Sequence, residues 1–154
     1  MADVVVSIEV SKVQYTVWLR TSFVGVSKVS EGGVSMVEQI ELGPDQEAAF
    51  VNFLDEATRE IAKIFVSRQG DASGVPFEHS GTTAIYRFHE GEPVLPQAVS
   101  LKASLDEDTK NAIYCYITLL WFNAKGDKDM YSYLSSRYEK LVSNIDRNLY
   151  KLHD

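Results

Sequence analysis

The last quarter of the chain carries the most regular pattern of apolar and polar residues. From residue 128 to residue 152, apolar side chains recur at steps of three or four, and mostly polar or charged side chains fill the positions between them. The apolar positions are Tyr131, Leu134, Tyr138, Leu141, Ile145, Leu149 and Leu152. This spacing is typical of an amphipathic helix with one face on a core, so it predicts a helix over residues 128–152.

A nearly continuous apolar segment comes before this helix. Residues 112–122 are apolar or aromatic except for Thr118. As a helix they would rise about 16 Å, roughly half the thickness of a bilayer's hydrocarbon core. Charged residues also lie close to both ends of the segment. We therefore expect a helix covered by protein on several sides, and not a membrane span.

The residues on either side of this segment predict where the helix begins and ends. Ser104 and Glu107 fit a capping box at its start. Gly126 stands where a glycine often ends a helix in a left-handed conformation. The expected helix therefore covers residues 105–124. Only Gly126 and Asp127 offer a connection to the next helix, so the two should form an antiparallel hairpin.

Two further regions are expected to be regular. Asp45 is a good N-cap, and apolar residues at helical spacing follow it, which predicts a helix over residues 46–66. Residues 75–101 favour β structure, with a hairpin of residues 76–79 and 83–89 and a short edge strand over residues 98–101.

The N-terminal segment is open to two interpretations. Val4–Val10 is rich in β-branched residues, and the alternation from Val13 to Leu19 also fits a strand. The same stretch has a helical face, and we favour a helix over residues 10–22. Together the patterns predict an α+β fold: one mainly helical domain over residues 1–154, with a C-terminal helix hairpin and a small β-hairpin or sheet.

Charge and cysteine content narrow the function. The 154 residues include 15 Lys and Arg against 22 Asp and Glu, which gives a formal net charge of -7. This balance opposes binding to a phosphate backbone, which needs clustered cations. Cys115 is the only cysteine, so no internal disulfide can form and a reducing compartment is expected. The first ten residues lack the basic leader of a signal peptide.

The candidates for chemistry are few. Cys115 lies in the apolar helix with no cationic neighbour in sequence, so we expect a buried, inert thiol. His79 and His89 flank the predicted hairpin beside Glu78 and Glu90, and could together hold a transition metal. The sequence has no HExxH or CxxC motif, no phosphate loop and no nucleophile elbow. We therefore expect no enzyme, no cofactor and no bound metal.

Aromatic residues are the more informative feature. The chain has eight Tyr, seven Phe and two Trp. Tyr133 is offset by about 100° from Leu134 and about 200° from Tyr131 on a helix, so it should point away from the core. Tyrosine is enriched at protein interfaces. The residues predicted to form an interface are Trp18, Phe23 and Tyr133.

Two segments resemble a known family. The stretch "TSFVGVSK", residues 21–28, is similar to the end of the first helix in small virion proteins of tailed bacteriophages. Residues 112–149 look like the C-terminal hairpin of those proteins. In that hairpin an apolar helix ends in an aromatic pair, here Trp121 and Phe122, and an acidic turn and a Tyr-rich helix follow. The nearest likeness is to the connector or ring proteins of phages that infect Bacteroidales, including the crAss-like group.

The resemblance implies a non-enzymatic structural protein of the virion, made in the bacterial cytoplasm. Such proteins form rings between portal and tail, so the implied partners are copies of the chain and the portal, tail and other ring proteins. DNA would pass through without specific binding, and no membrane is involved. The alternative is a cytoplasmic protein-interaction module, an adaptor or inhibitor that works as monomer or dimer. An enzyme built around His79 and His89 is a third possibility.

Overall fold

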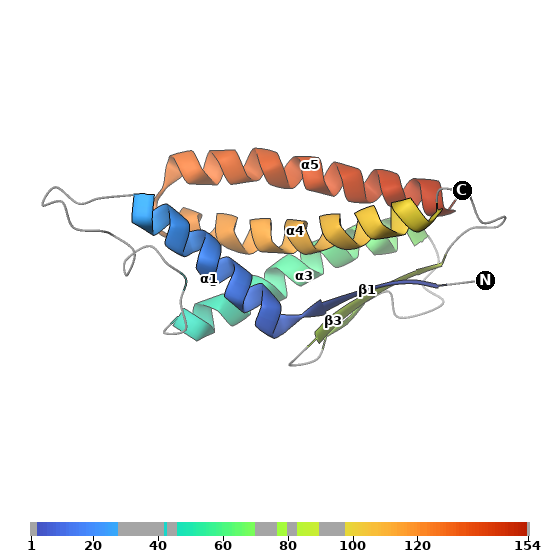
Figure 1. Ribbon diagram of the computed structural model, residues 1–154, viewed down its shortest axis with the longest axis horizontal. Helices are drawn as coiled ribbons and strands as arrows, with labels where there is room; N and C mark the ends of the chain where they lie inside the picture. The colour runs from blue at the N-terminus through green and yellow to red at the C-terminus, as the bar shows by residue number, and fades with distance from the viewer. Residues whose placement is uncertain are drawn as a thin grey trace, which may run out of the picture.

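Four helices and three strands make up the described part of the protein. The computed structural model describes residues 3–27, 42, 46–69, 77–79, 83–89 and 98–153, with the backbone alone in β2, β3 and several helix ends. The elements are β1 (Asp3–Glu9), α1 (Val10–Ser27), α3 (Glu47–Gln69), β2 (Phe77–His79), β3 (Thr83–His89), α4 (Ala98–Ala124) and α5 (Lys128–His153). Figure 1 shows α4 and α5 side by side, with α1 and α3 crossing below them.

The helix hairpin of α4 and α5 is closed by a short, well-bonded turn. Gly126 has a φ of 76°, a left-handed conformation that a glycine adopts without the strain of a Cβ atom. The backbone N–H of Asp127 donates to the carbonyl of Phe122 at 3.0 Å, which satisfies one of the last carbonyls of α4. The side chain of Asp127 accepts a hydrogen bond from the backbone N–H of Met130 at 3.1 Å and so caps α5.

Helix α4 is longer than the sequence predicts. It begins at Ala98, so the expected edge strand over residues 98–101 is wrong. Ser104 and Glu107 lie inside the helix on its exposed side, and therefore do not form the N-terminal capping box. The reason is burial: Leu105 is completely buried and Leu101 packs against the same core, so the packed face continues about one turn upstream of the predicted start.

The core surrounds α4. Ile113 and Ile117 are completely buried, and Leu120 is partly buried against a second cluster formed with α5. Helices α1, α3 and α5 all contact α4. The main cluster unites side chains from all four helices and one strand: Ile8, Val13, Val17, Leu42, Phe50, Leu54, Ala57, Ile61, Phe65, Leu105, Ala112, Ile113, Ile117, Trp121, Ile145, Leu149 and Leu152.

The three strands form a small antiparallel sheet in the order β1-β3-β2. In the register, Asp3 pairs with His89 and Glu9 with Thr83, so β1 lies along the whole of β3. The N-terminal segment thus divides between the two interpretations. Residues 3–9 are a strand, and α1 begins at Val10 and continues to Ser27, beyond the expected helix over residues 10–22.

The predicted α+β class is wrong, because the protein is mainly helical. Among the buried core side chains of the described residues, Ile8 is the one that a strand supplies. The sheet is a minor addition at the start of α1, while helical spacing of apolar residues builds the core. The prediction gave the strands a place in the fold class because β-branched runs are easy to detect in short segments.

A core substitution tests the central position of α4. Ile117→Ala should lower the free energy of unfolding by about 2–5 kcal/mol, because it leaves a cavity in a packed interior. Urea denaturation measures the change, and Val51→Ala, at a half-exposed position of α3, is the control. A loss below about 0.5 kcal/mol for Ile117→Ala would show that α4 is not the centre of the core.

A buried hydroxyl offers a second test. Thr109 is completely buried, and its Oγ1 has no hydrogen-bond partner among the described residues. Thr58 is also completely buried, but its hydroxyl donates to the carbonyls of Leu54 and Asp55. Thr109→Val should therefore raise the free energy of unfolding by about 1 kcal/mol, since an unsatisfied polar group is removed. Thr58→Val should bring no gain, and equal effects in the two variants would contradict this explanation.

Candidate interaction surfaces

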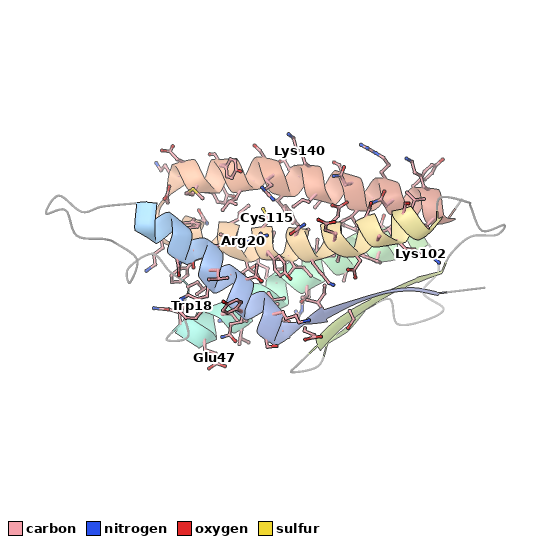
Figure 2. All side chains as sticks on the ribbon, viewed as in Figure 1. Trp18, Arg20, Glu47, Lys102, Cys115 and Lys140 are labelled. Carbon is pink, nitrogen blue, oxygen red and sulfur yellow. The ribbon has the colours of Figure 1, made fainter. Side chains whose placement is uncertain are left out.

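The predicted interface residues lie on separate surfaces. Tyr133 is 60% exposed, the orientation that its spacing on α5 predicts. Trp18 is half-buried and packs edge to face on the exposed Tyr15, with ring centroids 6.3 Å apart. Figure 2 shows Trp18 on the lower side of α1, near the start of α3 and away from α5. The side chain of Phe23 lies outside the described residues. Trp18 and Tyr133 therefore cannot belong to one continuous patch.

Helix α5 has two flanks, one toward α1 and the other toward α3. Arg137 and Tyr138 follow each other on this helix, so their side chains leave it about 100° apart. The positive charge of Arg137 is close enough to lower the pKa of Arg20 in α1. Tyr138 packs on Tyr116, and the charge of Glu60 in α3 raises the pKa of Tyr138. We call these the α1 flank and the α3 flank.

The α1 flank is built around a half-buried guanidinium. Arg20 Nη2 donates to Asn111 Oδ1 of α4 at 3.3 Å, and the guanidinium carbon lies 5.1 Å from the centre of the Tyr114 ring. Figure 2 shows Arg20 beside Cys115 where α1 passes α4. Burial lowers the pKa of Arg20, and the positive charge of Arg137 lowers it further. Two cations thus share this flank.

Neither cation is neutralised. No carboxylate of the described residues forms an ion pair with Arg20 or Arg137, whereas four other cations of the described residues have such partners. Two guanidinium groups near one another raise each other's electrostatic energy. The exposed Tyr133 lies four residues before Arg137, hence on the same side of α5. The α1 flank therefore combines positive charge with an exposed aromatic ring.

The α3 flank has the opposite charge. The Tyr116 hydroxyl donates to Glu56 Oε1 at 3.0 Å, and the rings of Tyr116 and Tyr138 lie 4.9 Å apart. Burial raises the pKa of Tyr116 to about 12, helped by the hydrogen bond to Glu56 and by the charges of Glu56 and Glu60. Burial also raises the pKa of Tyr138, and the nearby Tyr116 and Glu60 raise it further by smaller amounts. Both phenols are therefore neutral hydroxyl groups at neutral pH.

A shallow groove of about 430 Å³ continues along this flank between α3 and α5. Glu60 and Asp146 line it together with Lys63, which bonds Glu60 at 2.7 Å. Glu56 lies one turn before Glu60 and has no ion-pair partner among the described residues. Tyr131 is 39% exposed and lies seven residues, about two helical turns, before Tyr138, so it belongs to this flank. The α3 flank thus joins carboxylates to an exposed tyrosine.

Cys115 is a poor nucleophile in this setting. It is buried, and its thiol donates to the backbone carbonyl of Leu134 at 3.3 Å. Burial raises the pKa of Cys115 to about 11, and the opposing charges of Arg137 and Arg20 do not offset the burial. The thiolate, which is the reactive form, is therefore almost absent at neutral pH.

The two histidines of the hairpin are not brought together. His79 pairs with Ala84 in the register of β2 and β3, while His89 lies five residues further along β3. Five residues of strand cover about 17 Å, too far for one metal ion to bind both side chains. The backbone register therefore gives no support to a metal site shared by His79 and His89. Within the described residues, no group of three or more His, Cys, Asp or Glu side chains is placed to hold a metal.

Sequence reasoning missed the charge division between the two flanks. Arg20, Glu56 and Glu60 are far apart in the sequence and belong to different helices. Their proximity to α5 depends on how α1 and α3 cross α4, which periodicity does not reveal. The spacing of Tyr133 and Arg137 by four was the one signal that the sequence offered.

Comparisons leave the chain without an identified relative. No protein-family model, no curated protein and no solved structure matches it. In the part of the chain that the structure describes, no helix has the length and apolar character needed to cross a membrane.

Thiol labelling tests the environment of Cys115. With a pKa of about 11, the thiolate fraction at pH 8 is about 0.1%, against about a quarter for a free cysteine. The native protein should react with a thiol-specific disulfide reagent at least 100-fold more slowly than it does in denaturant, about in proportion to that ratio. The rate should rise about tenfold per pH unit between pH 7 and 9. Labelling of the native protein as fast as in denaturant would contradict the burial.

Proposed function

We propose that the protein is a non-enzymatic structural component of a tailed-phage virion, a head–tail connector or ring subunit. It would assemble with copies of itself and with portal and tail proteins around the channel through which DNA leaves. The resemblance of residues 112–149 to the C-terminal hairpin of connector and ring proteins supports this class of protein. The observation that carries assembly is the exposure of Tyr133, at 60%.

The position of Tyr133 supports an interface role for a physical reason. The core stripe of α5 is already occupied by Leu134, Ile145 and Leu149, so folding gains nothing from Tyr133. A large, rigid aromatic side chain on a packed helix loses little conformational freedom when a partner covers it. Such residues often carry much of the binding energy of an interface.

The charge of the chain also supports passage of DNA. At -7 per subunit, a ring would carry a large negative charge. Acidic groups along a channel repel the phosphate backbone, which favours sliding over sticking. A cytoplasmic adaptor remains the alternative, and it would not be found in purified particles.

Incorporation into particles tests the proposal. Tyr133→Ala should leave the melting temperature within about 1 °C of the wild type, because the side chain makes few core contacts. It should reduce incorporation into tailed particles severalfold, measured by quantitative mass spectrometry of purified virions. Tyr150→Ala is the matched control, since Tyr150 is 51% exposed on the same helix.

Two results would count against the proposal. Absence of the wild-type chain from purified particles would favour the cytoplasmic adaptor. A fall in melting temperature for Tyr133→Ala as large as that expected for Ile117→Ala would show that Tyr133 belongs to the core.

A further inference from the structure

We infer that the α1 flank of one subunit binds the α3 flank of the next, in a head-to-tail contact between copies of this chain. The inference rests on the proposed assembly and adds to it the two surfaces that meet. Its starting point is that one small domain presents two flanks of opposite charge on either side of α5.

The α1 flank requires an acidic partner. Arg20 is held in place by Asn111 and the Tyr114 ring, so its guanidinium is already ordered before anything binds. Arg137 is close enough to lower the pKa of Arg20, and neither has a carboxylate partner among the described residues. Carboxylates are the natural ligands of a guanidinium, which can bind them through two parallel hydrogen bonds. A neighbour that supplied carboxylates would remove the repulsion between the two cations.

The α3 flank supplies such groups. Glu56 is exposed and accepts a single hydrogen bond from Tyr116, so its other lone pairs remain available. Glu60 lies one turn further along α3 and forms an ion pair with Lys63. Asp146 lines the same groove from α5. The carboxylates of Glu56 and Glu60 outnumber the single ammonium group of Lys63, so this part of α3 favours a positive surface.

Each flank also carries an exposed tyrosine. Tyr133 accompanies Arg137 on the α1 flank, and Tyr131 lies near Tyr116 on the α3 flank. Two residues apart on a helix, the two rings leave α5 about 200° apart and cannot serve the same surface. Exposed ion pairs alone stabilise little, about 0–1 kcal/mol each. The tyrosines add the apolar contact area that ion pairs lack.

The use of two different surfaces has a geometric consequence. When a protein binds itself through one surface, the contact closes at a dimer. When two different surfaces of the same chain meet, the contact repeats, and it gives a ring if the rotation closes. A head-to-tail contact between the flanks therefore suits a ring subunit better than a single self-complementary patch would. Because the contact is partly ionic, salt should weaken it.

Sedimentation velocity with flank variants tests the inference. One variant changes the α1 flank, Arg137→Ala with Tyr133→Ala, and the other changes the α3 flank, Glu56→Gln with Tyr131→Ala. Wild type should show a sedimentation coefficient that rises between about 10 µM and 1 mM and falls back in high salt. Each variant alone should associate at least about tenfold more weakly. Arg147→Ala with Tyr150→Ala, an arginine and a tyrosine further along α5, should behave as wild type.

Mixing the two variants distinguishes the modes of contact. In an equal mixture each partner keeps one intact flank, so pairs should form and growth should stop at the dimer. Wild type that stays monomeric to about 1 mM would overturn the inference. So would a mixture that remains monomeric, because an intact α1 flank and an intact α3 flank would then fail to bind each other. A variant that associates by itself as strongly as wild type would also overturn it, because one flank would then be binding its own copy.

Failure here and failure of the proposed function give different results. A chain that enters particles but stays monomeric in solution keeps the proposed function and excludes the head-to-tail contact. A chain that associates head to tail but is absent from particles supports the head-to-tail contact and excludes the proposed function. Circular dichroism of each variant shows whether it has folded before association is measured.

Discussion

The burial of α4 is the constraint on which the rest of the structure depends. A helix that is apolar on nearly every side is stable in water only when other elements cover it. Here α1, α3 and α5 share that task, and the completely buried Ile113 and Ile117 lie at the centre. Three helices around a fourth leave two boundaries beside α5, one with α1 and one with α3. The α1 flank and the α3 flank lie along these boundaries. The helices that bury α4 therefore also form the two flanks that carry the charged and aromatic groups.

The arrangement separates stability from interaction within one helix. On α5, Leu134, Ile145 and Leu149 meet the core, while Tyr133 and Arg137 on one side and Tyr131 on the other remain accessible. Substitutions on the exposed side should have little effect on folding, because few packed contacts are lost. The proposed assembly would benefit from that division, since a subunit could fold first and bind its neighbours afterwards. The turn at Gly126 and Asp127 fixes the register of α5 on α4 and thereby the direction in which each flank faces.

The sequence predicts the helices far better than it predicts what they bring together. Spacing alone identified the face of α5 and the exposure of Tyr133, because helical periodicity is a local property. The start of α4 was misplaced, since Ser104 and Glu107 imitate a cap in a helix that burial extends to Ala98. The predicted α+β class was wrong because the strand-like runs form short strands beside four long helices. The register of the strands places His89 five residues from Ala84, the partner of His79, which the sequence spacing of the two histidines does not reveal.

Net charge is a weaker guide than its distribution. The value of -7 suggests a surface that repels other copies of itself. The structure divides that charge: two guanidinium groups that form no ion pair within the described residues lie on one side of α5, and the carboxylates of α3 lie on the other. Repulsion between whole subunits acts over the Debye length of about 8 Å at physiological salt, whereas contact between opposite flanks acts at hydrogen-bond distance. An acidic chain can therefore stay dispersed at low concentration and still associate in one orientation when copies are held close together. Such a balance suits a subunit that should assemble only where other components gather it.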